Sequence, residues 1–160
     1  MRTNGHYRGF TLIELVITLM IVALLSTIAL PVAELAVQRS KEQELRSALR
    51  QIRTAIDTYK QAWDEGRIAT SIGKTGYPAT LEVLVEGVDD PSSPQKSKIY
   101  FLRRIPRDPF ATDPTQTAAE TWGKRSYASS ADEPQDGEDV YDVYTKAPGN
   151  DLRGIPYRNW

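Results

Sequence analysis

The hydrophobic residues are concentrated in one stretch near the start of the chain. No charged residue occurs among the 19 residues from 15 to 33, and Glu14 and Glu34 stand on either side of them. As an α-helix these residues would span about 28 Å, close to the ~30 Å hydrocarbon core of a bilayer. The pattern therefore predicts a transmembrane helix over residues 10–33.

Beyond residue 34 the pattern becomes amphipathic. Apolar residues recur at intervals of three and one, which is typical of a helix with one apolar stripe. The stripe comprises Leu45, Ala48, Leu49, Ile52, Ala55, Ile56, Tyr59, Ala62 and Trp63. Charged residues such as Glu42 and Glu44 are assigned to the other faces, and Gly66 is a suitable stop. We therefore expect one helix from about residue 11 to residue 64, with residues 34–65 as an amphipathic half that a globular head covers.

Residues 66–160 form that head in this interpretation, and they are rich in proline and glycine. A turn at Tyr77-Pro78 precedes a short helix that ends near Gly87, and residues 99–102 are a short extended run. Alternating patterns predict strands over residues 122–129 and 139–145, and the aromatic tail at residues 152–160 can pack against the head. The expected fold class is α+β, with a long N-terminal helix packed on a small antiparallel β-sheet.

Pro31 lies inside the helical pattern. It removes one backbone hydrogen bond and clashes with the carbonyl of Thr27, so we expect a kink or a locally melted turn there. A simple bend where the helix leaves the membrane is the alternative explanation.

Composition excludes several classes of activity. The 20 basic and 21 acidic side chains leave no basic excess of the kind that nucleic-acid binders carry. The chain has no cysteine, and its single histidine is His6, which excludes Ser-His and Cys-His catalysis and most zinc sites. A membrane-anchored hydrolase with paired carboxylates is the enzymatic alternative, and the small, proline-rich head argues against it. We expect a structural protein and not an enzyme.

The flanking charges predict the orientation of the membrane segment. Arg2 and Arg8 precede it, which places the N-terminus in the cytoplasm and the head across the membrane. A cleaved secretory signal peptide is one alternative, although its apolar stretch is usually only about 7–15 residues long. A plain uncleaved anchor is another.

Glu14 separates these alternatives because it lies inside the apolar block. An isolated carboxylate within a bilayer costs about 2.5–3.5 kcal/mol on insertion scales. A helix that served only as a membrane anchor would therefore insert more favourably with leucine at position 14. Either Glu14 lies shallow, near the headgroups, or it meets a positive charge when copies of the helix pack together. A free α-amino group of a neighbouring chain would supply that charge.

The residues around Glu14 carry a resemblance. A short basic leader followed by Gly9-Phe10-Thr11-Leu12-Ile13-Glu14 resembles the prepilin peptidase site of the type IV pilin superfamily. The resemblance implies cleavage between Gly9 and Phe10, removal of a leader at residues 1–9 and methylation of the new Phe10 amine. It also implies that Glu14 pairs with the Phe10 amine of an adjacent subunit, and that Pro31 marks where the helix unwinds during polymerisation.

Four segments of the head are similar to the major pseudopilin of type II secretion systems. They are Gly76-Tyr77-Pro78, the run from Phe101 to Phe110, Trp122-Gly123 and Val140-Tyr141-Asp142-Val143-Tyr144. Arg103, Arg104 and Arg107 in the second segment can form salt bridges across a subunit interface or remain solvated.

The resemblance implies a filament subunit in the bacterial inner membrane, with its head in the periplasm. Its partners would be copies of itself, minor pseudopilins, an inner-membrane assembly platform and the prepilin peptidase. Growth of the periplasmic filament would drive protein export across the outer membrane. The alternative is a type IV pilin, major or minor, for adhesion, motility or DNA uptake.

Calcium is the one cofactor that the resemblance raises, because the family's major subunit typically binds it in a C-terminal loop. Here Asp151 is the only carboxylate side chain among residues 147–160, and Arg153 and Arg158 lie nearby, whereas calcium prefers six to eight oxygen ligands. The acidic run from Asp132 to Asp142 could attract a cation, but it lacks EF-hand spacing and is better interpreted as a solvated loop. Asp151 is therefore the only candidate metal ligand.

Overall fold

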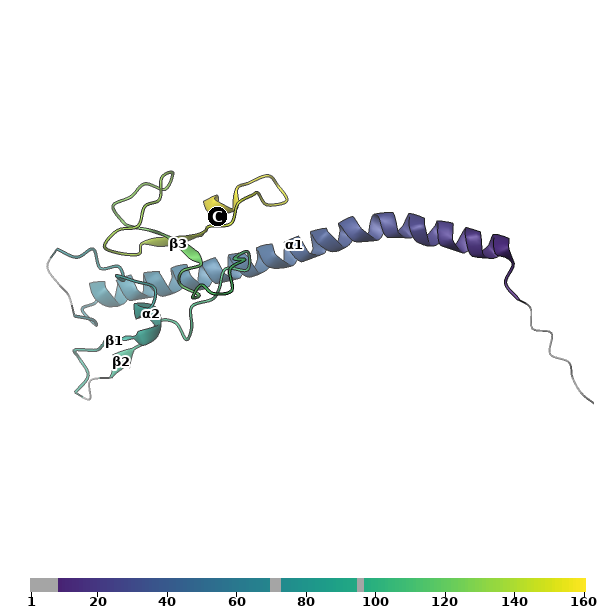
Figure 1. Cartoon of the computed structure of the whole chain (residues 1–160). Helices are drawn as coiled ribbons and strands as arrows, with labels where there is room; N and C mark the ends of the chain where they lie inside the picture. Colours follow the sequence, from purple (N-terminus) through teal and green to yellow (C-terminus); the bar gives the residue numbers. More distant parts are fainter. Residues whose placement is uncertain (1–8, 70–72, 95–96) are drawn as a thin grey trace, which may run out of the picture. The chain divides into compact units, whose positions relative to one another are not determined.

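The computed structural model describes residues 9–69, 73–94 and 97–160 (Figure 1). Most of the leader expected at residues 1–9, including Arg2, His6 and Arg8, lies outside the described residues. The chain divides into two compact units, residues 1–40 and residues 41–160. Helix α1 (Leu12–Asp64) contributes to both units, and its bounds agree with the expected helix.

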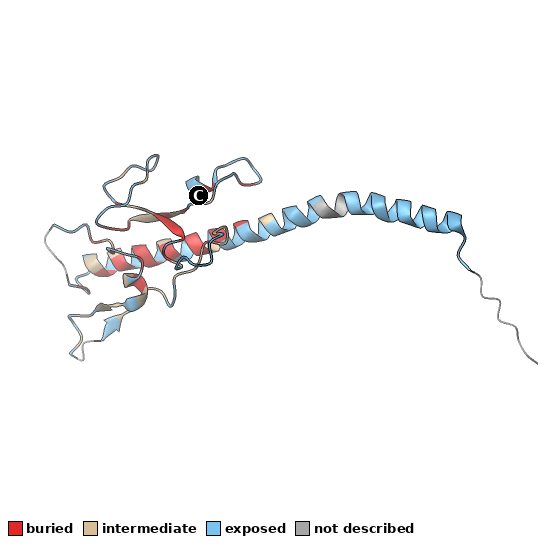
Figure 2. Ribbon diagram, viewed as in Figure 1, coloured by how far each residue is buried: buried red, intermediate tan, exposed pale blue. Residues whose placement is uncertain are grey.

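The first unit consists of the apolar part of α1. Every described large apolar side chain from Leu12 to Val37 is exposed, and Figure 2 shows these described residues of α1 in pale blue. The hydroxyl groups in this segment bond to carbonyls of their own helix: Thr18 Oγ1 donates to Leu15 O at 2.8 Å and Ser26 Oγ to Val22 O at 2.8 Å. By length and composition α1 can cross a membrane, and no other helix of the described residues can.

Helix α1 continues through Pro31. The helical assignment is unbroken on both sides of this residue, without the locally melted turn that was one of the two expectations. The flanking residues stay helical although the proline removes one N–H from the helix ladder and crowds the carbonyl four residues before it.

The second unit is built on the remainder of α1, from Lys41 onward. All the residues of the predicted stripe except Trp63 are buried, and Leu45 and Ile52 have no exposed surface. Figure 2 shows this stripe in red along α1. Tyr59 of the stripe packs against Phe101 of the head, with ring centroids 5.2 Å apart. The amphipathic pattern therefore identified the core face of the helix.

The prediction for Glu42 was wrong, because this residue is buried and not on a solvated face. It is only 7% exposed, and it faces the C-terminal loop of the head.

Gly66 ends α1 as predicted. Its φ of +70° is left-handed, a conformation that glycine adopts at little cost. The amide of Gly66 donates to Trp63 O at 3.0 Å and that of Arg67 to Ala62 O at 2.8 Å. This pair of bonds is a Schellman motif, which satisfies carbonyls at the end of the helix.

Beyond α1, the described residues of the head form one short helix, four short strands and a 3₁₀ turn. Helix α2 (Val83–Glu86) ends at Gly87, near the predicted position. Strands β1 (Val88–Asp89) and β2 (Lys98–Ile99) form one antiparallel pair, with Val88 opposite Ile99. Strands β3 (Trp122–Arg125) and β4 (Asp142–Thr145) form the other, with Trp122 opposite Thr145. The turn η1 (Tyr157–Asn159) buries Tyr157 near the end of the chain, as predicted for the aromatic tail.

The strands β3 and β4 are shorter than predicted, for two reasons. After Arg125 the chain turns, since Ser129 N donates to Ser126 O at 3.1 Å and Ser126 N donates to Gln135 O at 2.9 Å. Before β4, Val140 N donates to Pro78 O at 2.8 Å and not to β3. Within β4, Val143 and Thr145 form the buried face, whereas Tyr141 lies outside the strand.

Candidate assembly site

The N-terminus of α1 is closed by a reciprocal pair of contacts between Thr11 and Glu14. The Glu14 carboxylate accepts hydrogen bonds from Thr11 N at 3.1 Å and from Thr11 Oγ1 at 3.2 Å. In return, Glu14 N donates to Thr11 Oγ1 at 3.3 Å. This is a capping box, in which a threonine and a glutamate three residues later satisfy helix donors that have no partner within the helix.

The capping box gives Glu14 a role that the sequence interpretation missed. The signal was present, because Thr-x-x-Glu before an apolar run is the usual signature of this motif. The carboxylate therefore lies against the backbone next to Phe10, the residue at which cleavage is expected. Gly9 and Phe10 themselves are exposed and outside the helix.

A second polar contact fastens the C-terminal loop of the head to α1. Glu42 Oε1 accepts hydrogen bonds from Leu152 N at 3.2 Å and from the buried hydroxyl of Tyr157 at 3.0 Å. Tyr157 also packs on Phe110 and Trp160, with ring centroids 4.7 Å and 5.3 Å away. A buried carboxylate needs such donors to offset its lost hydration.

Asp151 has no carboxylate oxygen free for a metal ion. Its Oδ1 accepts from the amides of Arg153 at 2.8 Å and Ile155 at 2.9 Å, and its Oδ2 accepts from the Arg153 guanidinium at 2.9–3.0 Å. Burial on its own raises the pKa of Asp151, but these N–H donors outweigh it, so the pKa lies below its usual value.

The residues present therefore do not fit the calcium ion that the resemblance suggested. Calcium requires several oxygen ligands, and here the nearest groups to Asp151 are N–H donors and a guanidinium. In the part of the chain that the structure describes, no group of three or more His, Asp or Glu side chains is arranged to hold a metal ion.

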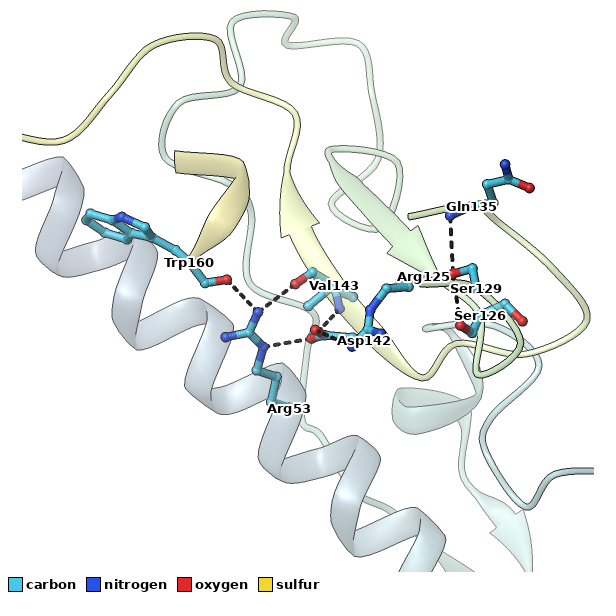
Figure 3. Close-up of polar contacts among 8 residues, drawn as sticks. All are labelled: Arg53, Arg125, Ser126, Ser129, Gln135, Asp142, Val143 and Trp160. Atoms are coloured by element: carbon cyan, nitrogen blue, oxygen red, sulfur yellow. Dashed lines mark hydrogen bonds and ion pairs between the residues drawn. The ribbon is translucent and has the colours of Figure 1, made fainter. Parts of the chain in front are cut away.

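A network of arginines connects α1 with the β3–β4 pair (Figure 3). Arg53 Nε donates to Asp142 Oδ1 at 2.7 Å, and Arg125 Nη2 donates to Asp142 Oδ2 at 3.2 Å. The second nitrogen of Arg53, Nη2, reaches the carbonyl oxygens of Val143 at 3.1 Å and Trp160 at 2.7 Å. Arg53 thereby joins three segments that are far apart in the sequence.

The proline-rich segment from Phe101 to Phe110 is anchored by its aspartate. Asp108 is 2% exposed; its Oδ1 accepts from Phe110 N at 2.8 Å and its Oδ2 accepts from Thr145 Oγ1 of β4. Arg107 donates to the carbonyl oxygens of Asp113 and Gln116, so it braces its own loop. Arg103 and Arg104 are exposed, which leaves both the interface and the solvated interpretation open for them.

Asp139 holds the end of the loop between β3 and β4 against the segment after α1. It accepts hydrogen bonds from Thr75 Oγ1 and from Tyr127 N, the latter at 2.9 Å. Burial raises the pKa of Asp139, and the hydrogen bonds from Thr75 and Tyr127 lower it further than burial raises it. The next carboxylate, Glu138, pairs with Lys74 at 3.0 Å on the surface.

Comparison with known proteins identifies the N-terminal segment and relates most of the chain to one set of proteins. Residues 4–30 match the model of the prokaryotic N-terminal methylation motif, which covers Gly9, Phe10 and Glu14. The chain is 26% identical to type II secretion system core protein G of Klebsiella michiganensis over 110 residues, which are 66% of this chain and 70% of the relative.

Two further relatives bear the same name. The Escherichia coli K12 protein is 26% identical over 117 residues, covering 71% of this chain and 73% of the relative, and the Klebsiella pneumoniae protein is 27% identical over 110 residues, covering 66% and 71%. No solved structure matches the chain significantly. With its methylation motif, its long apolar helix and, among the described residues, two small antiparallel sheets, the chain has a pilin-like α+β architecture and is homologous to type II secretion system core protein G.

Proposed function

We propose that this chain is the structural subunit of a type II secretion pseudopilus, and that it polymerises through its N-terminal helix to drive protein export across the outer membrane. The observation that carries the proposal is the contrast within α1. Its later half is buried by the head, whereas Leu12 is 81% exposed and Leu24 is 66% exposed. Such a surface requires lipid or other helices, because exposed apolar patches of this length are unstable in water.

Processing precedes assembly in this proposal. A prepilin peptidase cuts between Gly9 and Phe10, which removes the leader at residues 1–9 and leaves a Phe10 amine that is then methylated. The mature helix lies in the inner membrane with its head in the periplasm until an assembly platform extracts it. Minor pseudopilins are further partners. The methylation motif across residues 4–30 supports this sequence of events.

Packing of the apolar segments against one another then forms the filament core. Between helices in lipid the association depends on close packing and polar contacts, since lipid chains are as apolar as leucine. Glu14 contributes by pairing with the Phe10 amine of an adjacent subunit, and an unmatched carboxylate at that depth is penalised. We infer that Glu14 sets the register between copies, and that Pro31 is where α1 opens during assembly.

The alternative function is that of a type IV pilin for adhesion, motility or DNA uptake, which would have the same cleaved and methylated N-terminus and the same apolar helix. The relatives named above are secretion proteins, which favours the pseudopilus. Neighbouring genes for a secretion ATPase and a secretin would support secretion, whereas a retraction ATPase would support a pilus.

The structure provides a matched pair of variants for the test. Glu14→Gln removes the charge and keeps a cap, whereas Thr11→Ala removes the threonine cap and keeps the charge. We expect both proteins to be inserted and processed, which mass spectrometry would show as a chain that starts at methylated Phe10. Thr11→Ala should form filaments visible by electron microscopy, and Glu14→Gln should not.

Two results would contradict the proposal. If the protein purified from membranes still starts at Met1, the leader is not cleaved and the proposed processing step is wrong. Normal filaments from Glu14→Gln, together with none from Thr11→Ala, would mean that Glu14 acts only as a cap.

A further inference from the structure

The head has a recess, rich in arginine, between α1 and the C-terminal loop. Its volume is about 340 Å³, and it is lined by Arg46, Arg50, Arg53 and Arg153, with Ile155 and Trp160 among its apolar members. No carboxylate of the described residues lines it. Guanidinium groups bind oxyanions through paired N–H donors, so a recess of this composition favours an anionic group. We call it the basic recess.

Two of these arginines have their charge compensated within the chain. Arg53 pairs with Asp142 at 2.7 Å (Figure 3), and it also lines a neighbouring recess together with Asp132. Arg153 pairs with Asp151 at 2.9 Å. Both arginines help to shape the basic recess, but the free positive charge there must come from the other two.

Arg46 and Arg50 supply that free charge. Among the described residues, no salt bridge involves either of them. The Arg46 guanidinium lies over the ring of Trp160, with its central carbon 4.3 Å from the ring centroid, and this contact holds its plane in place. Glu44, an exposed carboxylate two residues before Arg46, lines a different recess beside Arg104. Two uncompensated positive charges therefore lie at the basic recess.

Two exposed apolar side chains accompany these charges on the C-terminal loop. Leu152 is 42% exposed and Ile155 is 40% exposed, and Ile155 lines the basic recess. In the part of the head that the structure describes, the only other exposed large apolar side chains are Tyr100 and Tyr127. Apolar side chains beside basic ones are typical of surfaces that lie in the headgroup region of a membrane.

The attachment of the C-terminal loop to α1 limits its distance from the membrane segment of the proposed function. Leu152 N donates to Glu42 Oε1, and Glu42 is the second residue of the head unit. Glu42 lies nine residues after Ala33, the last residue of the uncharged stretch, and nine helical residues extend at most about 14 Å. The polar layer on each side of a bilayer is about 5–8 Å thick. The length of chain therefore keeps the loop close to the lipid headgroups.

We propose that the basic recess and its two apolar neighbours bind the anionic phospholipid headgroups of the membrane that α1 crosses. Arg46 and Arg50 bind lipid phosphate groups, while Leu152 and Ile155 enter the interfacial layer beside them. This inference rests on the proposed function, and it adds where the head lies before assembly. The head is held at the membrane surface, and it must leave that surface when the subunit joins a filament.

Nanodiscs that each hold one copy of the full chain test the contact, because a second copy is then absent. The chain has no cysteine, so Leu152→Cys provides a single site for an environment-sensitive dye. Two fluorescence lifetimes of the dye distinguish heads docked on lipid from heads in water. We expect the ratio of docked to undocked heads to be at least fivefold higher in phosphatidylglycerol than in phosphatidylcholine. The same dye at Ser92→Cys, an exposed position after β1, should respond equally to both lipids.

Charge neutralisation then identifies the residues responsible. A basic residue near an anionic lipid surface contributes about 1 kcal/mol, which is about fivefold in an equilibrium. Arg50→Gln should therefore lower the docked-to-undocked ratio in phosphatidylglycerol about fivefold. Arg103→Gln neutralises another exposed arginine, one that does not line the basic recess, and should leave the ratio unchanged. Raising the salt concentration to about 1 M, where the Debye length is about 3 Å, should also lower the ratio.

The outcomes distinguish this inference from the proposed function. Equal docking in the two lipids, or equal effects of Arg50→Gln and Arg103→Gln, overturns the headgroup contact and leaves the pseudopilus proposal intact, because filament formation is measured separately. A dye response that occurs only in discs holding two copies assigns the surface to a contact between heads and also overturns the headgroup contact. A full chain that does not insert into the discs overturns both proposals.

Discussion

Glu42 provides the strictest test of how the head is held together. This carboxylate on α1 accepts hydrogen bonds from Leu152 N at 3.2 Å and Tyr157 OH at 3.0 Å, more than 100 positions away in the sequence. Glu42→Ala removes the acceptor and leaves both donors, one of them a buried hydroxyl, without this partner. We therefore expect the C-terminal loop to lose its attachment to α1 and the head to be destabilised.

The size of the effect follows from these two bonds. A hydrogen bond to a charged group contributes about 1.5–3 kcal/mol, so losing two sets an upper range of about 3–6 kcal/mol. Burying the carboxylate has its own cost, which the alanine variant avoids. We expect a net loss of about 2–4 kcal/mol, which is roughly a 30- to 1,000-fold change in the unfolding equilibrium. Glu42→Gln keeps an acceptor oxygen and should cost about 1 kcal/mol.

Chemical denaturation of the full chain in detergent, followed by tryptophan fluorescence, measures this free energy. Trp122 is fully buried in the head and Trp160 packs on Tyr157, so the emission reports both the core and the loop. Glu44→Ala is the matched control, since it makes the same substitution at an exposed position of the same helix and intrinsic helix propensity cancels. If Glu42→Ala is no more destabilising than Glu44→Ala, the attachment inferred from the hydrogen bonds is wrong.

Three further measurements address other parts of the head. The pKa of the Asp139 carboxyl is lower in the folded protein than the value of about 3.9 in the unfolded chain. Its ionised form therefore stabilises the fold fully above about pH 3.9, and this stabilisation is lost as the pH falls through the folded pKa. On acidification, the melting temperature of Asp139→Asn should fall less than that of the parent protein. Excess EGTA should leave the melting temperature unchanged, whereas Arg153→Ala should lower it; a drop on chelation would restore the calcium hypothesis. Gly123→Ala would place a Cβ 2.3 Å from the Tyr144 ring and should cost about 1–3 kcal/mol in denaturant titrations, with Tyr144→Thr in the same chain removing most of that cost.

The sequence predicted the parts of this fold that depend on local periodicity. The stripe that includes Leu45 and Ile52 became the core face of α1, because a helix brings residues three and four positions apart onto the same face. The stop at Gly66 was predictable for a related reason, since a single residue supplies the left-handed conformation that the helix end requires.

The errors concern contacts between distant segments. The burial of Glu42 depends on Leu152 and Tyr157, and no pattern within α1 indicates that a C-terminal loop brings donors to that position. Asp151 shows a different limit, because its partners are only two and four residues away. The sequence showed a lone carboxylate near arginines, but the backbone turn at Gly154 is what places the amides of Arg153 and Ile155 on it. The lengths of β3 and β4 likewise depend on backbone hydrogen bonds outside the strand pair, from Ser126 N to Gln135 O and from Val140 N to Pro78 O.

The capping box at Glu14 changes the energetic argument for assembly. The cost of about 2.5–3.5 kcal/mol for a carboxylate in the bilayer applies to an isolated group, whereas Glu14 already accepts two bonds from Thr11. Pairing with a neighbouring Phe10 amine would then replace the hydrogen bonds from Thr11 with an ion pair. Only the difference in free energy between these two sets of contacts contributes to association. In the proposed assembly, packing of the apolar side chains against those of neighbouring helices must then supply most of the favourable free energy.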